Sequence, residues 1–206
     1  MFSEEQEKEE LGNLPTGQLS PQVFLKFQLL IMQLLETVDI HFQDGERTIR
    51  KTIEYGYGFQ KMVNKDFSYE DPPQLLIDLG NEVCDTLDEP RESFSNYIIS
   101  VYDPGFQIEP HYDTDLHHLK EYGFYFDEKV FGVIIKPDPT GGLYFAHYNG
   151  NDIHPPLDLK PRFPVIEKPG TVFVLKGKYR YKPYYHGVSE ISKLRISVTF
   201  RKVKLK

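Results

Sequence analysis

The chain has 206 residues but contains one cysteine, no tryptophan and no long apolar run. A lone cysteine, Cys84, excludes an intramolecular disulfide and fits a reducing compartment. The most apolar stretch, residues 23–35, is broken by lysine and glutamine, and no run approaches the roughly 18 residues of a membrane-spanning helix. Residues 1–10 are acidic and lack the basic and apolar regions of a signal peptide. We therefore expect an intracellular protein, cytoplasmic or nuclear, that is not secreted and has no membrane partner.

Excess positive charge is also absent, because 31 acidic residues outnumber 24 basic ones and the formal net charge is -7. This balance argues against strong non-specific binding to nucleic acid, which depends on neutralising phosphates. A local basic groove stays compatible with the sequence, and solubility is the alternative role for the same side chains. The clustered cations are Lys176, Lys178, Arg180, Lys182, Arg201, Lys202, Lys204 and Lys206.

The length suits one domain with a sizeable core. Residues 1–18 are acidic and interrupted by glycine and proline, and we expect a disordered tail there. Within the single domain 19–206, the part 19–93 holds the expected helices, at 21–38 and after Asp71-Pro72-Pro73, with a strand-rich segment over 40–67 between them. Part 94–206 holds short strands separated by turn signals, expected at 96–102, 131–136, 143–147, 171–176 and 194–202. This order predicts a mainly β fold, an antiparallel sandwich or barrel with flanking helices.

Two histidines and one aspartate are the candidate catalytic and metal-binding residues: His111, Asp113 and His186. Residues i and i+2 of a strand point to the same side, so His111 and Asp113 can hold one metal from a single strand or strand end. Two histidines and one carboxylate, with positions left for substrate and O2, suit non-haem Fe(II). His186 must come from a distant strand, which requires a sheet that curls back on itself. Taken alone, a His-x-Asp pair is more often a surface or capping pair.

The segment 195–201 alternates apolar and polar residues, as a strand does. Arg195, Ser197, Thr199 and Arg201 share the polar face. If this face looks into a barrel, two guanidinium groups are partly buried, and leaving them unpaired would be costly. A small dicarboxylate such as 2-oxoglutarate, which also chelates Fe(II), would satisfy both through charge-assisted hydrogen bonds. A strand with one solvated face is the alternative.

Aromatic side chains alternate along another predicted strand, at Tyr55, Tyr57 and Phe59. Aromatics placed in this way can stack an unpaired or flipped base, so they are candidate substrate-binding residues. Packing in the core is the alternative. Asp115 is a further candidate, at the mouth of a site near His111.

Together these motifs resemble the AlkB-like Fe(II)/2-oxoglutarate-dependent dioxygenases. The resemblance covers roughly residues 45–202, and its most specific part is the Arg-x-Ser-x-Thr-Phe-Arg segment. The matching pieces are Tyr55-Gly56-Tyr57-Gly58-Phe59, Pro72-Pro73 with Leu75-Leu76, Tyr102-Asp103-Pro104-Gly105 running into His111-Tyr112-Asp113, Tyr185-His186-Gly187-Val188, and Arg195–Arg201.

The resemblance implies a double-stranded β-helix, or jelly-roll, core over 94–206 that the helices of 19–93 support. It implies a metal-binding oxidoreductase with Fe(II), the cosubstrate 2-oxoglutarate and O2. The residues that it assigns to the metal are His111, Asp113 and His186.

For 2-oxoglutarate, the resemblance pairs Arg195 with the distal carboxylate and places Arg201 near the carboxylate at the oxo end. Tyr102 and Thr199 would add hydrogen bonds. Ser197 stands where many members have asparagine, and serine can still donate a hydrogen bond.

The implied activity is oxidative demethylation of alkylated bases in DNA or RNA, with an alkylated nucleic acid as the partner. We expect the protein to be a monomer. The long stretch between His111 and His186, which includes Gly141-Gly142-Leu143-Tyr144-Phe145, is more similar to the wider 2-oxoglutarate oxygenases, among them prolyl hydroxylases. The alternative is therefore a 2-oxoglutarate oxygenase that hydroxylates a protein side chain or a small molecule.

Overall fold

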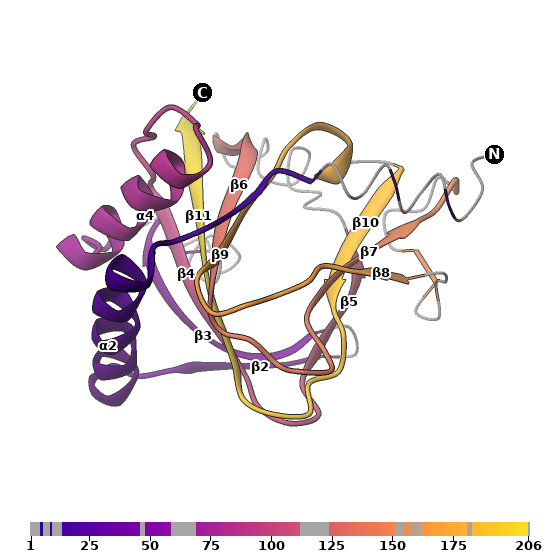
Figure 1. The fold of residues 1–206 in the computed structure, drawn as a ribbon, viewed down its shortest axis with the longest axis horizontal. Helices are drawn as coiled ribbons and strands as arrows, with labels where there is room; N and C mark the ends of the chain where they lie inside the picture. The colour runs from indigo at the N-terminus through magenta and orange to yellow at the C-terminus, as the bar shows by residue number, and fades with distance from the viewer. Residues whose placement is uncertain are drawn as a thin grey trace.

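The structure is a computed structural model (Figure 1). It describes residues 5, 9, 14–45, 48–58, 69–111, 124–150, 155, 156, 159, 162–180 and 183–205.

The described residues are mostly in strands. The helices with described bounds are α2 (Pro21–Thr37), α4 (Gln74–Thr86) and the short 3-10 helix η1 (Gly177–Tyr179). The strands are β1 (Thr16–Gln18), β2 (His41–Gly45), β3 (Thr48–Gly56), β4 (Asn96–Tyr102), β5 (Gln107–His111), β6 (Phe124–Lys136), β7 (Leu143–His147), β8 (Arg162–Pro164), β9 (Thr171–Leu175), β10 (Tyr184–Val188) and β11 (Arg195–Leu205).

Antiparallel pairing joins these strands in the order β1-β9-β6-β11-β4-β3-β5-β10-β7-β8, and β2 pairs with β3. Strand β3 links the two halves of this order. Its first residues pair with β5, and the remainder, from Lys51 to Gly56, pairs with β4. The sheet therefore folds over into two layers, with β5, β10, β7 and β8 facing the larger layer (Figure 1). This is the curled sheet that the distance between His111 and His186 in the sequence predicts.

Helices α2 and α4 lie against the outer face of the larger layer (Figure 1). The alternation in β11 accounts for this packing, because Ile196, Val198 and Phe200 are fully buried in the core cluster that also contains Phe27 of α2 and Leu79 of α4. The polar residues of β11 consequently point to the other face, toward the second layer. The period-two pattern of the sequence thus determines which face of β11 presents polar side chains to the interior.

The predicted first helix is confirmed at its start. The Oγ of Ser20 accepts a hydrogen bond from the backbone N–H of Val23 at 3.4 Å, and Pro21 occupies the first helical turn. Serine at the cap and proline just inside the helix are a favourable combination. Cys84 lies on α4 and is fully buried.

The predicted disorder of residues 1–18 is wrong for the end of that segment. Residues Thr16–Gln18 form β1, with Thr16 opposite Phe173 and Gln18 opposite Thr171 of β9. The side chain of Leu14 is only 7% exposed and packs in a core cluster. Composition alone suggested a tail, but β9 supplies the backbone hydrogen-bond partners that order this segment.

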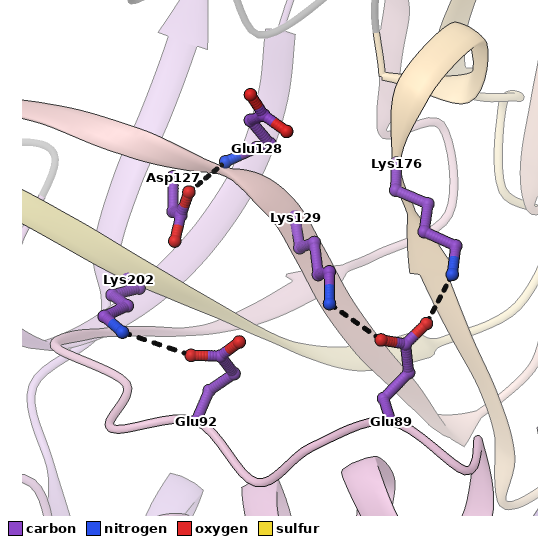
Figure 2. Close-up of polar contacts among 7 residues, drawn as sticks. All are labelled: Glu89, Glu92, Asp127, Glu128, Lys129, Lys176 and Lys202. Carbon is purple, nitrogen blue, oxygen red and sulfur yellow. Dashed lines mark hydrogen bonds and ion pairs between the residues drawn. The ribbon is translucent and has the colours of Figure 1, made fainter.

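A group of ion pairs fastens the connection after α4 to the sheet (Figure 2). The carboxylate of Glu89 accepts hydrogen bonds from Lys129 at 2.7 Å and Lys176 at 2.5 Å, and Glu92 pairs with Lys202 at 3.2 Å. Burial alone would raise the pKa of Glu89, but the two lysines outweigh it and hold that pKa below its usual value. The contacts join the 87–95 connection to β6, to β11 and to the residue that follows β9.

Among the described elements, no helix has the length and apolar character to cross a membrane.

Candidate active site

The two histidines predicted as metal ligands lie opposite each other on neighbouring strands. His111 ends β5 and is the antiparallel Cα partner of His186 in β10. The centroids of their rings are 4.5 Å apart, with the ring planes at 53°. Two imidazoles at this separation on one face can contribute two ligands to a single cation.

A bulge in β5 gives His111 this position. Ile108 pairs with Val188, and His111 pairs with His186. Between these two pairs the chain advances by three residues in β5 but by two in β10. The extra residue of a β-bulge re-aims the side chain that follows it. Without it, strict alternation would place Ile108 and His111 on opposite faces.

The ring of His111 is oriented by its own strand. Its Nδ1 lies 2.9 Å from the carbonyl oxygen of Glu109. In the neutral ring, an Nδ1–H that donates to this carbonyl leaves the lone pair on Nε2. Such a hydrogen bond on the second ring nitrogen is the usual way in which a protein orients a metal-binding histidine.

Close packing explains the glycine that follows His186. A Cβ atom at Gly187 would lie 2.5 Å from the carbonyl oxygen of Ile108 and 2.6 Å from the Oη of Tyr144. Any larger residue would therefore push β10 away from β5 and separate the two histidines. The His-Gly pair of the sequence has a packing reason as well as a chemical one.

Arg195 is buried on the inward face of β11 and forms an ion pair with Glu167. Its Nε donates to one carboxylate oxygen of Glu167 at 2.9 Å, and its Nη2 donates to the other at 2.6 Å. The side chains are 2% and 4% exposed. Burial alone would lower the pKa of Arg195, but the Glu167 carboxylate outweighs it and raises that pKa. The guanidinium therefore stays charged, in a bidentate buried ion pair.

This pair corrects one step of the sequence argument. A dicarboxylate ligand was expected to satisfy both Arg195 and Arg201, but Glu167, a residue of the chain itself, already forms the bidentate pair with Arg195. The Nη1 of Arg201 donates to the Oγ1 of Thr199 at 2.9 Å. The inward placement of the arginines agrees with the prediction, whereas the need for an outside ligand to neutralise Arg195 does not follow.

Tyr102 connects the arginine to the histidine pair. The Cζ of Arg195 lies 5.2 Å from the centre of the Tyr102 ring. Tyr102 packs in one cluster with Ile108 and Val188, the residues that face each other beside the histidines in β5 and β10. Contact through this cluster places Arg195 and the histidines along one side of the same interior.

A serine lies two residues from Arg195 in β11, and another lies two residues from Tyr102 in β4. The Nη1 of Arg195 donates to the Oγ of Ser197 at 3.2 Å, and Ser197 is the Cα partner of Ser100 in β4. Ser100 in turn accepts a hydrogen bond from the Nη1 of Arg50 at 3.3 Å. The interior therefore carries a third cationic side chain, Arg50, beside the predicted two.

Glu167 and Arg50 are residues of this interior that were not predicted from the sequence. Glu167 lies 28 residues before its partner, on the connection between β8 and β9, and nothing in the local pattern indicates that partner. Arg50 occurs in the polar run Arg50-Lys51 of a predicted strand, where alternation could have placed it on the same face as Thr52. That alternation was the only available signal.

The predicted substrate-binding aromatics have different positions. Tyr55 is buried in the core cluster between the larger layer and the helices, which favours the alternative of core packing. Burial raises the pKa of its hydroxyl. Tyr57 is half-buried and its ring packs edge-on against Tyr69, with centroids 5.1 Å apart. Phe59 lies outside the described residues.

Asp113 and Asp115 also lie outside the described residues. Within the described residues, no three histidine, cysteine, aspartate or glutamate side chains gather around a common point. Two facing imidazoles are suitable donors for a transition metal, and the predicted third ligand, Asp113, follows His111 by two residues. The donor set that the structure describes therefore fits an iron site in part. Arg195 keeps donors that fit an anionic cosubstrate.

No protein-family model and no curated protein matches the sequence. Solved structures do match the fold. The structure of OsALKBH1 has a TM-score of 0.60 at 16% identity and covers 92% of this chain and 99% of its own. The prolyl hydroxylase from Trichoplax adhaerens, solved with a fragment of hypoxia inducible factor, has a TM-score of 0.59 at 10% identity. The match covers 94% of this chain and 86% of the hydroxylase chain. The epimerase SnoN, solved with Fe3+, alpha-ketoglutarate and nogalamycin RO, has a TM-score of 0.57 at 11% identity, and the match covers 96% of this chain and 82% of the epimerase chain.

These likenesses establish the fold. The chain is mainly β, with a double-stranded β-helix, or jelly-roll, core and flanking helices, as the sequence predicts. At identities this low, the similarity concerns the fold alone and leaves the substrate of this chain to be tested.

Proposed function

We propose that this chain is an Fe(II)- and 2-oxoglutarate-dependent oxygenase. The observation that carries the proposal is the pair His111 and His186, which a bulge in β5 brings face to face inside a jelly roll. Arg195 lies on the same interior, through its contact with Tyr102. The proteins with this fold include one solved with iron and alpha-ketoglutarate.

In this proposal, His111, His186 and Asp113 hold Fe(II), and Arg195 receives the distal carboxylate of 2-oxoglutarate. When bound, iron, 2-oxoglutarate and O2 together supply oxidation of a C–H bond, with succinate and CO2 as co-products. Arg201, Ser197, Thr199 and Tyr102 are the further residues proposed to contact the cosubstrate.

The protein's own contribution is orientation and exclusion of water. The carbonyl of Glu109 orients the ring of His111, and Ser197 accepts a hydrogen bond from the Arg195 guanidinium. In this proposal, the apolar cluster of Tyr102, Ile108 and Val188 limits the access of water to the space between these groups. Fixed donors in a dry site strengthen every polar contact made there.

For the substrate, we propose alkylated bases in DNA or RNA. Support comes from the Arg-x-Ser-x-Thr-Phe-Arg strand, which forms β11 with its polar residues turned inward, and from the similar fold of OsALKBH1. Oxidation of an N-methyl group gives an N-hydroxymethyl group, which releases formaldehyde and the unmodified base.

A second candidate is hydroxylation of a protein side chain or a small molecule. The core position of Tyr55 favours it, because this position removes one aromatic from the proposed stacking face. The net charge of -7 favours it too. Two of the structures with this fold were solved with a peptide and with a small molecule.

Substrate-dependent turnover separates the two candidates. The assay measures succinate and loss of methyl mass from single-stranded oligonucleotides that carry N1-methyladenine or N3-methylcytosine, with Fe(II), 2-oxoglutarate and ascorbate. We expect methyl loss with the wild type and none with His111→Ala. Succinate formed without methyl loss would exclude the nucleic-acid proposal and favour the second candidate.

A further inference from the structure

The hydrogen bonds of Arg195 leave part of its guanidinium available inside the protein. A guanidinium has five N–H donors. Among the described residues, three of those in Arg195 are used, two toward Glu167 and one toward Ser197. One N–H on Nη1 and one on Nη2 remain for another acceptor, on a side chain that is 2% exposed. These two donors fit a second carboxylate.

The place of Glu167 is built for a carboxylate. Besides the guanidinium, the backbone N–H of Leu143 donates to Glu167 at 2.9 Å. Gly142 has a φ of +149°, and a Cβ atom there would lie 2.8 Å from the Glu167 carboxyl carbon. The local backbone therefore accommodates the Glu167 carboxylate in two ways. Leu143 donates a hydrogen bond to it, and the absence of a side chain at Gly142 leaves room for it.

Glu167 changes the electrostatics of the anion site. Arg195 alone would offer one full positive charge to an anionic ligand, whereas the Arg195–Glu167 pair is neutral. A ligand carboxylate on the two remaining donors would share one guanidinium with the Glu167 carboxylate. Like charges this close in a buried site repel strongly.

We propose that Glu167 is a specificity-determining residue of the cosubstrate site, which lowers its preference for a dicarboxylic 2-oxo acid over a monocarboxylic one. This inference rests on the proposed function, because it assumes that the distal carboxylate of 2-oxoglutarate binds at Arg195. If Glu167 only positioned Arg195, the opposite result would be expected, because loss of the ion pair would then weaken the binding of 2-oxoglutarate.

Binding of two ligands to two proteins tests the proposal without turnover. The ligands are 2-oxoglutarate and 2-oxopentanoate, which has the same carbon chain without the distal carboxylate. The proteins are the wild type and Glu167→Gln, each loaded with Mn(II), and calorimetry gives each Kd. Glutamine keeps the size of the side chain and removes its charge. We expect the Kd of 2-oxoglutarate to fall about tenfold or more in the variant, and the Kd of 2-oxopentanoate to stay the same.

The matched control is Glu89→Gln. It makes the same chemical change in a partly buried carboxylate with two cationic partners, on the helix-bearing side of the sheet (Figure 2). We expect it to leave both Kd values unchanged. A 2-oxoglutarate Kd that is unchanged or higher in Glu167→Gln would overturn the inference while leaving the proposed function in place.

Two further outcomes are decisive. If neither acid binds either protein, the proposed function fails and the inference fails with it. If Glu167→Gln does not fold, the wild type alone gives the answer. A neutral Arg195–Glu167 pair predicts that 2-oxoglutarate binds less than about tenfold more tightly than 2-oxopentanoate, and a preference above about a hundredfold would overturn the inference.

Discussion

Replacing Asp138 by asparagine is expected to destabilise the fold next to the proposed site. The carboxylate of Asp138 is 5% exposed and accepts hydrogen bonds from the backbone N–H groups of Thr140, Gly141 and Lys193, at 2.9, 2.6 and 2.6 Å. The Oγ of Ser192 adds a donor at 3.0 Å. These bonds join the turn after β6 to the loop before β11. They therefore fix the backbone that leads into Leu143 of β7 and into Arg195 of β11.

The magnitude follows from the pKa of Asp138. Burial alone would raise this pKa, but the hydrogen bonds from Thr140 and Lys193 outweigh it and lower the pKa from 3.8 to about 2. A tenfold change in an acid dissociation constant corresponds to about 1.4 kcal/mol, so the charged form contributes about 2 kcal/mol to the free energy of unfolding. Asparagine cannot accept the same set of bonds, because one of its side-chain atoms is a donor. We expect Asp138→Asn to lose about 2 to 4 kcal/mol at neutral pH.

Because the folded pKa of Asp138 lies below the unfolded one, its contribution is fully present above the unfolded pKa of about 4 and is lost as the pH falls toward the folded value. About half of the contribution should be gone by pH 3. Urea unfolding of wild type and Asp138→Asn between pH 7 and pH 3 measures this, with the exposed Asp71→Asn as the control. A free-energy difference that does not shrink as the pH falls would refute the reasoning.

Three further changes test other parts of the structure. His186→Ala removes one of two facing imidazoles, and we expect Mn(II) affinity, measured by calorimetry, to fall at least about tenfold; an unchanged affinity would contradict the metal site. Phe200→Ala leaves a cavity at a fully buried position between β11 and the helices. The free energy of unfolding, measured in urea, should fall by about 3 to 5 kcal/mol. A loss below about 1 kcal/mol would contradict the core position of Phe200. Glu89→Gln removes the charge that two half-exposed lysines share and should cost about 1 kcal/mol, less at high salt; equal losses at low and high salt would argue against an ionic contribution.

Local pattern was sufficient for much of the fold. The helix predicted at 21–38 agrees with α2, and the inward face of β11 followed from the alternation between Arg195 and Arg201. The predicted strand 143–147 agrees with β7, and 96–102 agrees with β4. These features depend on a few neighbouring residues, which is why the sequence reveals them.

Features that depend on distant partners were not predictable. Strand β1 exists because β9 offers it backbone partners, and Leu14 alone gives no sign of that pairing. The bulge that turns His111 toward His186 depends on the register between β5 and β10. Glu167 is part of the site only because the connection between β8 and β9 brings it to Arg195.

The positions of the tyrosines show a further limit. Alternation placed Tyr55 and Tyr57 on one strand face, but β3 ends at Gly56, so only Tyr55 continues into the core. A pattern of aromatics does not indicate which face of the sheet the helices will cover. That choice is made by α2 and α4, which lie elsewhere in the sequence.

The central claim is that the histidine pair and Arg195 form one oxygenase site. Conversion of 2-oxoglutarate to succinate tests it most directly, measured without added substrate in the presence of Fe(II), O2 and ascorbate, for the wild type and for His186→Ala. The account predicts slow, iron-dependent succinate formation by the wild type and none by a folded His186→Ala variant. Equal succinate formation by both proteins, or failure of the iron-loaded wild type to bind 2-oxoglutarate, would contradict it.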